Sequence, residues 1–364
     1  MQVKDIISEL ERFAPLDYQE SYDNSGLLIG DLKMEVTGAL CTLDVTEEVI
    51  GEAVSTNCNL IISHHPVIFS PLKKLTGQTP SEIIAQLAIQ HNIAIYCGHT
   101  NFDNVFYGVN NKISEKLGLK DLKILQPLSN NLVKLVTFVP SDHAERVRNS
   151  MFLAGAGHIG SYDSCSYNLE GYGTFRGSED TNPYVGKKGE MHTEKETRIE
   201  TIVPKPILGG VLNSMIKFHP YEEVAYDIYP LTNTQANSGA GMIGRLENAI
   251  SGAQLLEICK EIFHCKSIAY IGNENKQIKK IAVCGGSGSF LINKAAQTAD
   301  AFITGDIKYH QFLDAKKDLF LLDIGHFESE QFTTEIFYDI IKEKFATFAV
   351  RLSETRTNPV KYYS

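Results

Sequence analysis

The sequence lacks the features that mark several classes of protein. It has no tryptophan, no apolar run of membrane-spanning length and no Lys/Arg-rich run. Non-specific nucleic-acid binding takes its affinity mainly from the neutralisation of phosphates by basic side chains. Because 34 basic residues stand against 44 acidic ones, the formal net charge is −10, and we do not expect nucleic acid as the primary partner. The absence of a long apolar run also predicts no membrane insertion.

Cysteine is scarce, and its pattern does not indicate a disulfide framework. No Cys-x-x-Cys spacing occurs, and several cysteines lie inside apolar, strand-like runs; the seven are Cys41, Cys58, Cys97, Cys165, Cys259, Cys265 and Cys284. An odd number of mostly buried thiols suits a reducing compartment. Met1 to Phe13 has apolar residues at helical spacing among charges, which predicts an amphipathic helix and not a signal peptide. We therefore expect a cytoplasmic protein.

The most distinctive stretch is an apolar run that ends in two adjacent histidines. Asn59 to Ile62 is short and apolar, which is typical of a buried strand in a parallel sheet, and Ser63-His64-His65-Pro66 follows it. In open α/β sheets, ligands bind beyond the carboxyl ends of the strands. Imidazole is the commonest metal ligand among side chains. The pattern therefore places two candidate ligands at a functional edge.

Two further apolar runs end in the same way. The first leads into Gly98-His99-Thr100-Asn101-Phe102-Asp103, and the second leads into Gly325-His326-Phe327-Glu328-Ser329-Glu330. If a helix begins after Gly325, His326 and Glu330 are four residues apart and share one face. Three strand ends thus carry His64, His65, Asp103, His326 and Glu330. This mixed nitrogen and oxygen set suits zinc, iron or manganese.

Each of these residues also has a plainer interpretation. His64 and His65 can be solvated imidazoles at a strand end, Asp103 can cap a helix, and His326 with Glu330 can form a surface hydrogen bond. His99 can be a proton shuttle, a group that supports the ligands, or a ligand itself. The remaining histidines that we considered, His91, His158 and His310, read as ordinary residues, with His310 a candidate pocket residue.

The order of expected elements indicates an α/β core interrupted by an insert. Strands and helices alternate from residue 36 to residue 99, which favours a parallel or mostly parallel sheet. After Gln126-Pro127 the order becomes βαββαβ, the split ferredoxin-like unit. A soft polar linker is expected over 232–241. We therefore predict three segments: 1–126 and 232–364 as the two halves of the core, and 127–231 as an inserted domain.

The second half of the core repeats features of the first. A glycine loop at 285–289 follows a strand, and it is either an anion cradle at a helix N-terminus or a tight turn. It lacks the Gly-Lys-Ser/Thr of a nucleotide P-loop. The run that ends at Thr304-Gly305-Asp306 parallels the one that ends at His64-His65. Two similar α/β halves that face each other would bring His64, His65 and Asp103 opposite His326 and Glu330, at the kind of junction where pockets form.

These segments together resemble the type-two GTP cyclohydrolase I family, also called the NIF-three-like family. The resemblance covers roughly the first and last thirds of the chain. It is carried by Ser63-His64-His65-Pro66, Gly98-His99-Thr100-x-x-Asp103, Gly325-His326-x-x-x-Glu330, Tyr22-Asp23-Asn24-Ser25-Gly26-Leu27-Leu28-Ile29-Gly30 and Thr304-Gly305-Asp306-Ile307-Lys308-Tyr309-His310. The family usually has tryptophan where this chain has Tyr22, which affects a packing position and no ligand. His219-Pro220-Tyr221-Glu222 resembles CutA-like and PII-like small domains.

The resemblance implies a specific site and activity. It assigns two divalent metal ions, with zinc the first expectation and iron or manganese alternatives, to His64, His65, Asp103, His326 and Glu330, with Asp103 as the bridge. It assigns His99 and Asp103 as catalytic candidates and implies hydrolytic opening of the GTP ring by metal-bound hydroxide. It also implies a homohexamer that acts on a nucleotide-like small molecule. The alternative is a non-enzymatic metal-binding or protein-interaction scaffold.

Overall fold

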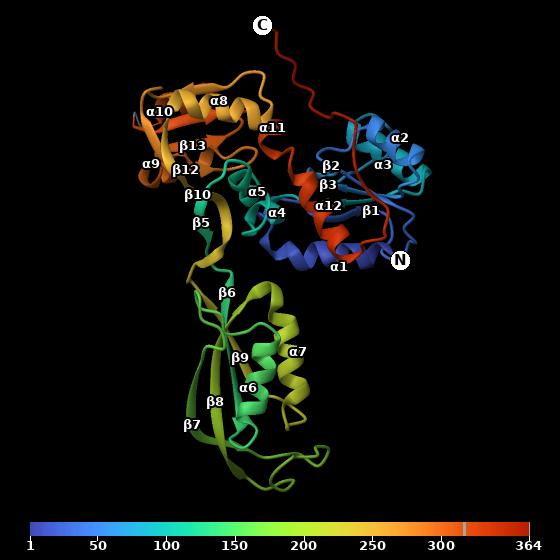
Figure 1. The fold of residues 1–364 in the computed structure, drawn as a ribbon. Helices are drawn as coiled ribbons and strands as arrows, with labels where there is room; N and C mark the ends of the chain where they lie inside the picture. Colours follow the sequence, from blue (N-terminus) through green and yellow to red (C-terminus); the bar gives the residue numbers. More distant parts are fainter. Residues whose placement is uncertain (316–317, 364) are drawn as a thin grey trace. The chain divides into compact units, whose positions relative to one another are not determined.

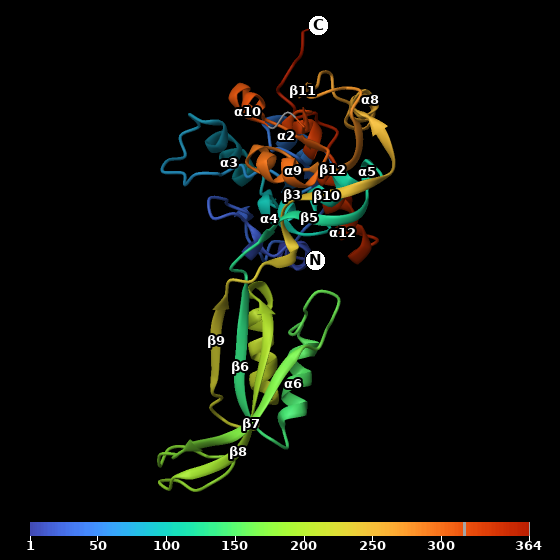
Figure 2. The same cartoon turned by 90° about the vertical axis from the view of Figure 1, so that its left-hand side faces the viewer.

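The computed structural model describes residues 1–315 and 318–363, which form two compact units (Figures 1 and 2). The core unit comprises Met1–Pro127 and Asn237–Ser364, and the inserted unit comprises Leu128–Ala236. The mixed α/β class expected from the alternation of strands and helices is confirmed. We describe each unit separately.

The first sheet of the core unit has the strand order β1-β4-β3-β2-β15. Its strands are β1 (Gly26–Ile29), β2 (Ala39–Thr42), β3 (Leu60–Ser63), β4 (Ala94–Cys97) and β15 (Val350–Leu352). Strands β4, β3, β2 and β15 run parallel, and β1 is antiparallel to β4. Every residue of β2, β3 and β4 is buried, which explains why their sequences read as continuous apolar runs.

Helices cover both faces of this sheet. Helices α2 (Glu47–Ser55) and α3 (Pro80–Gln90) pack on one face, where Leu40, Ile61 and Ile95 point. Helices α1 (Val3–Phe13) and α12 (Thr333–Lys344) pack on the other face (Figure 1). The period of two along the strands divides the apolar side chains between the two layers. The result is a three-layer arrangement whose strand ends are left open for the site.

The second sheet of the core unit has the order β11-β14-β13-β12-β10-β5. Its strands are β5 (Lys120–Leu128), β10 (Gln235–Ser251), β11 (Ala269–Ile271), β12 (Gln277–Val283), β13 (Ala301–Thr304) and β14 (Phe320–Asp323). Strands β12, β13 and β14 are parallel. The helices of this half are α8 (Gly252–Phe263), α9 (Ile292–Thr298), α10 (Tyr309–Asp314) and α11 (His326–Glu330).

The two sheets exchange edge strands, so they do not divide at the boundaries of the predicted halves. Strand β5, most of which belongs to the predicted first half, joins the second sheet, and β15 from the C-terminal segment joins the first. Helix α12 also packs on the first sheet. One continuous apolar cluster includes residues of both sheets, with Tyr96 on β4 of the first and Phe320 on β14 of the second. Helices α4 (Thr100–Asn104) and α5 (Val109–Lys116) complete the core unit.

The inserted unit has the element order β6-α6-β7-β8-α7-β9 that the sequence predicts. Its elements are β6 (Leu132–Pro140), α6 (Ala144–Leu153), β7 (Ser166–Phe175), β8 (His192–Pro204), α7 (Leu208–Phe218) and β9 (Tyr226–Leu231). The sheet order is β7-β8-β6-β9, with antiparallel neighbours. Both helices pack on one face through a cluster that includes Val147 and Met215. The opposite face of the sheet carries no helix of this unit.

The prediction of a soft linker over 232–241 is wrong, because β10 begins at Gln235. The glycines of this segment allow close approach of two strands. A Cβ atom at Gly239 would lie 2.1 Å from the carbonyl oxygen of Gln126 on β5, and the φ of Gly239 is +149°. A side chain cannot occupy that position without moving the backbone. Composition alone cannot separate this use of glycine from its use in a linker.

Two expectations from composition concern the thiols and the membrane. All seven cysteines are free, and all except the half-buried Cys165 are buried. Within residues 1–315 and 318–363, no helix combines the length and the apolar character needed to cross a bilayer.

Candidate metal centre

The candidate ligands lie just beyond the carboxyl ends of parallel strands in both sheets. His64 and His65 follow β3, which ends at Ser63, and His99 and Asp103 follow β4. His326 opens α11, three residues after β14 ends at Asp323, and Glu330 ends the same helix. Each short helix after β4 and β14 therefore holds one carboxylate a single turn beyond its histidine. This is the placement that the strand-end motifs predict.

The structure brings all six candidate residues together. Three overlapping groups each offer ligand atoms within 4.8 Å of one another: His64, His65 and His99; His65, His326 and Glu330; and His64, Asp103 and Glu330. His99, whose role the sequence left open, thus lies with the ligand-type nitrogens. His91, His158 and His310 belong to none of these groups among the described residues.

All four histidines use Nδ1 for an oxygen acceptor. The distances from Nδ1 are 2.8 Å for His64 to the Gly98 carbonyl, 2.7 Å for His65 to Asp44, 2.7 Å for His99 to Asp23 and 2.6 Å for His326 to Asp306. A carbonyl or an ionised carboxylate can only accept, so each Nδ1 carries the hydrogen. Nε2 is then the nitrogen with a free lone pair. Metal-binding histidines are typically oriented in this way.

Two buried atoms of the group have no hydrogen-bond partner. They are Nε2 of His64 and Oδ1 of Asp103, which lie 3.7 Å apart. His64 is completely inaccessible to solvent. A buried polar atom without a partner costs about 1–3 kcal/mol, so native structures rarely tolerate one. A cation between the lone pair and the carboxylate oxygen would satisfy both atoms, so the residues present fit a divalent metal ion.

Glu330 is the carboxylate that reaches the histidines of both sheets. Its Oε2 lies 3.0 Å from Nε2 of His65 and 3.0 Å from Nε2 of His326, and its Oε1 lies 3.5 Å from Nε2 of His64. The family resemblance gives the bridging role to Asp103. Glu330 thus lies within 3.5 Å of three histidines, whereas Asp103 lies 3.7 Å from His64. The bridging role of Asp103 stays a prediction.

The electrostatics of the cluster favour positive charge at its centre. Burial alone would lower the pKa of His65, but hydrogen bonds to Asp44 and Glu330 raise it to about 10. Burial also acts to lower the pKa of His326, but the hydrogen bond to Glu330 and its negative charge raise it to about 9. Burial and the nearby charge of Glu330 raise the pKa of Asp103 to about 7. The carboxylates that hold protons on these imidazoles are those that would attract a metal ion.

The glycine loop at 285–289 forms a wall of the cluster. A Cβ atom at Gly286, where φ is +61°, would lie 2.2 Å from Oε1 of Glu330 and 3.3 Å from Nε2 of His326. The amides of Gly285, Gly286 and Gly288 already donate to side-chain oxygens. The structure therefore favours the tight turn over the anion cradle, because these donors are already used.

Three carboxylates around the histidines had no assigned role as their partners in the sequence. Asp44 and Asp306 follow β2 and β13 at the same strand-end edge as the ligands, and Asp23 precedes β1. The strand-end rule that singled out the histidines would also have pointed to Asp44 and Asp306. Asp23 lies before an antiparallel strand, where that rule gives no signal.

Comparison with known proteins yields matches over the whole chain. The profile described as Duf34/NIF3 (NGG1p interacting factor 3) matches residues 1–359. A Halalkalibacterium halodurans protein named GTP cyclohydrolase 1 type 2 homolog is 39% identical over 363 residues, 98% of this chain and 98% of the relative. A Bacillus subtilis protein of the same name is 37% identical over 363 residues, 98% of this chain and 97% of the relative.

Solved structures agree with these matches. The crystal structure of a Bacillus cereus protein related to NIF3 has a TM-score of 0.86 and 37% sequence identity, and the alignment covers 100% of this chain and 99% of the other. A Staphylococcus aureus protein gives a TM-score of 0.78 at 30% identity, with 100% and 99% covered. The similarity extends through the core unit and the inserted unit alike.

Proposed function

The chain belongs to the Duf34/NIF3 family, and on that premise we propose that it is a metal-dependent hydrolase resembling type-two GTP cyclohydrolase I. The proposed site holds two divalent ions, with zinc the first expectation and iron or manganese the alternatives. Its ligands are His64, His65, Asp103, His326 and Glu330. The relatives that support a nucleotide substrate do so by their name, GTP cyclohydrolase 1 type 2 homolog.

One observation carries the proposal. Nε2 of His64 and Oδ1 of Asp103 are buried, face each other at 3.7 Å and have no hydrogen-bond partner. Interiors of proteins pair such atoms, and a mixed imidazole and carboxylate set is a metal-binding combination. The Nδ1 hydrogen bonds add to this support, because they fix the other ring nitrogen of each histidine toward the same centre.

Two divalent ions in this place would act as Lewis acids and make a bound water nucleophilic at neutral pH. The protein itself contributes orientation and proton transfer. Asp44 and Asp306 hold the rings of His65 and His326. His99 is held by Asp23 through Nδ1, so its Nε2 is the atom that would take a proton during turnover unless it serves as a ligand. His99, as a proton acceptor, and Asp103, as the proposed bridging ligand, are therefore the catalytic candidates.

The finer features of the family resemblance are part of the same proposal. We propose that residues 127–231 are an inserted ferredoxin-like domain of the CutA or PII type. The order of its elements, with helices on one face of an antiparallel sheet, supports this assignment. We also propose a homohexamer. Its test is the molar mass in solution by light scattering, which should be six times that of one chain.

The test of the hydrolase proposal is turnover. Protein loaded with zinc, iron or manganese and incubated with GTP should release formate or a ring-opened product. Asp103→Asn should abolish the reaction, and Asp142→Asn, on the inserted unit, should not. The alternative is a non-enzymatic scaffold, which the family description as an interacting factor supports. It would gain if loaded protein turned over neither GTP nor other nucleotides and phosphoesters while a stable protein partner co-purified.

A further inference from the structure

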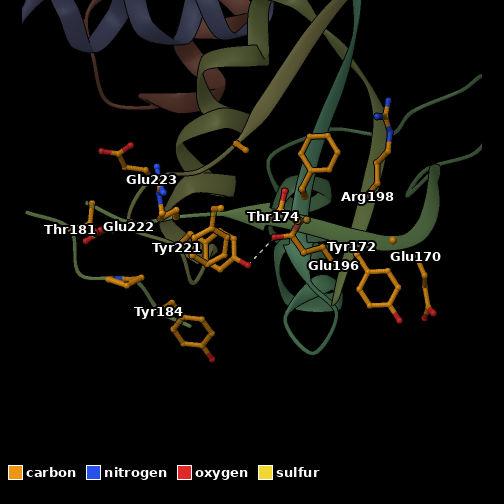
Figure 3. A pocket seen from close by; sticks show the side chains of 18 of the residues that line it. Glu170, Tyr172, Thr174, Thr181, Tyr184, Glu196, Arg198, Tyr221, Glu222 and Glu223 are labelled. Atoms are coloured by element: carbon orange, nitrogen blue, oxygen red, sulfur yellow. Dashed lines mark hydrogen bonds between the residues drawn. The ribbon is translucent and has the colours of Figure 1, made fainter. Parts of the chain in front are cut away.

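The inserted unit contains a cavity of about 660 Å³ that lies entirely within residues 138–225. It opens beside the edge strand β7, between that strand, β8 and the loop that precedes β9 (Figure 3). Small-molecule sites typically have volumes of about 300–1,000 Å³. None of the candidate metal ligands lies in this part of the chain.

The position of the cavity follows from the register of the sheet. Alternate residues of β6 and β8, such as Val139 and Ile199, point toward helices α6 and α7. The residues between them, including Phe138, Glu196 and Arg198, point to the face without helices. Phe138 and Arg198 are register partners on neighbouring strands. The cavity thus forms where this open face meets the β7 edge.

One wall of the cavity consists of aromatic rings. The ring of Tyr221 lies 6.0 Å from that of Phe175 and 6.4 Å from that of Tyr184, measured between centroids. Tyr172, which is 77% exposed, and Phe138 also line the cavity. Aromatic faces carry partial negative charge and attract cations held over them.

A buried carboxylate lies beside this wall. Glu196 is only 9% exposed, and its Oε1 accepts a hydrogen bond of 2.8 Å from the hydroxyl of Tyr221 (Figure 3). Burial and this hydrogen bond raise the pKa of Tyr221, so the phenol stays protonated and donates. Among the described residues, Oε2 of Glu196 has no hydrogen-bond donor and no basic side chain paired with it. One oxygen of the carboxylate is therefore available to a ligand.

The backbone of β7 makes room for this carboxylate. A Cβ atom at Gly173 would lie 2.1 Å from Oε2 of Glu196, so the carboxylate occupies the space that a side chain would fill. At Gly171, which faces Glu196 directly in the strand register, a Cβ atom would meet nothing within 4 Å. These two glycines offer matched positions for adding a methyl group.

The charge around the cavity is negative. Four glutamates line it, Glu170, Glu196, Glu222 and Glu223, against two arginines, Arg176 and Arg198. Arg198 is occupied elsewhere, since its Nε donates to Glu200 at 2.8 Å and its guanidinium lies 5.5 Å from the ring of Phe138. Figure 3 shows Arg198 directed away from Tyr221 and Glu196. Arg176 is exposed to solvent, whereas Glu196 is buried, so the buried charge beside the rings is that of a carboxylate.

We propose that the inserted unit binds a small organic cation, an ammonium or guanidinium group on an apolar body. The cationic group pairs with Oε2 of Glu196, and the apolar body packs against the rings of Phe175, Tyr184 and Tyr221. A carboxylate next to aromatic faces is complementary to such ligands in charge and in shape. This binding site is separate from the metal centre and does not depend on the proposed hydrolase activity.

The test uses three probes that share one indole body and differ in charge. Tryptamine is cationic, tryptophol is neutral and indole-3-acetate is anionic at neutral pH. In calorimetric titrations of the full chain, tryptamine should bind at least about tenfold more tightly than tryptophol. Indole-3-acetate should bind more weakly still. Equal or tighter binding of indole-3-acetate would overturn the proposal, and so would absence of binding by tryptamine, agmatine and tetraethylammonium at about 1 mM.

Variants locate the cationic group. Glu196→Gln keeps an oxygen acceptor for Tyr221 but removes the charge, and should weaken tryptamine about tenfold or more while leaving tryptophol unchanged. Gly173→Ala should weaken tryptamine similarly, because the added methyl displaces the carboxylate. Gly171→Ala should stay within about twofold of the unmodified chain. Equal tryptamine affinity in folded Glu196→Gln and the unmodified protein would rule out this carboxylate as the cation site.

Discussion

The candidate metal centre and the aromatic cavity are built in different ways from similar chemical groups. In the core unit, the candidate histidines lie just beyond the ends of parallel strands, and His65 and His326 have carboxylate partners at the same edge. In the inserted unit, Glu196 on β8 and Tyr221 in the loop before β9 are 25 positions apart and meet only in the folded unit. The first site can therefore be predicted from short sequence motifs, whereas the second can be identified only from the folded sheet.

The largest effect on metal binding is expected when a side chain is added to the glycine loop that lines the candidate metal centre. Gly286→Ala places a methyl 2.2 Å from Oε1 of Glu330 at a backbone φ of +61°. We expect loss of most of the bound metal, together with about 1–2 kcal/mol of backbone strain. Elemental analysis and circular dichroism of the purified variant measure both effects. The control is Gly51→Ala in helix α2, where a Cβ atom meets nothing within 4 Å. Full metal content in Gly286→Ala would contradict the close packing described.

A smaller effect is expected when a carboxylate that orients a ligand loses its charge. Asp44→Asn or Asp306→Asn removes the anion that fixes Nδ1 of His65 or His326. Such changes typically lower metal affinity about 10–100-fold. Competition with a chromophoric chelator measures this. The matched control is Asp142→Asn, whose carboxylate lies 3.7 Å from His143 outside the centre. Unchanged affinity in both variants would mean that these carboxylates do not position the ligands.

Acid should loosen the segment that joins the C-terminal end of the chain to this site. Glu52 accepts hydrogen bonds from Ser353, Glu354 and Thr355, and Thr357 donates to Asp44. Burial acts to raise the pKa of Glu52, but these hydrogen bonds hold it below its usual range. Because the pKa of Glu52 is lower in the folded than in the unfolded state, its ionised carboxylate stabilises the folded state above the unfolded pKa of about 4.3. That stabilisation is lost as the pH falls through the folded-state pKa.

Native-state hydrogen exchange at the amides of Glu354 and Thr355 tests this expectation. After correction for intrinsic rates, protection should fall several-fold between about pH 6 and pH 3. Glu52→Gln should have low protection at both values, and Glu47→Gln, an exposed change in the same helix, should behave like the unmodified chain. A segment whose protection is independent of pH in the unmodified chain would show that Glu52 does not hold it.

The smallest effect on the metal is expected from removing the inserted unit altogether. Leu132 at the start of β6 and Leu231 at the end of β9 are register partners, so the two ends of the unit lie side by side. A short Gly/Ser linker can therefore replace 128–236. Metal content should stay unchanged, whereas tryptamine binding should disappear. Loss of metal from a folded deletion variant would show that the two sites are not independent.

Much of the core and its candidate site could be predicted because the residues that define them are close together in the sequence. The strand that ends at Ser63 and the histidines after it are adjacent in sequence, and parallel strands bring such ends to one edge. The exchange of β5 and β15 between the sheets could not be predicted, since neither strand differs in composition from an ordinary edge strand. The prediction of a linker over 232–241 is wrong for a similar reason, because the close contact of Gly239 with Gln126 is non-local.

The cavity of the inserted unit shows the limit of sequence reasoning most clearly. His219-Pro220-Tyr221-Glu222 was noticed only as a resemblance to small domains, and Glu196 had no signal at all. The role of Tyr221 depends on a contact with β8, and the space for Glu196 depends on a glycine of β7. The register of β7 and β8 decides the second contact, and the path of the loop before β9 decides the first.

Elemental analysis of gently purified and reloaded protein tests the central claim most directly. We expect about two divalent ions per chain. His65→Ala and Glu330→Gln should fall to one or fewer without loss of helical signal, and His91→Ala, a change of an exposed histidine after α3, should keep both. No bound metal in the reloaded, folded, unmodified chain would contradict the assignment of His64, His65, Asp103, His326 and Glu330 as a metal centre.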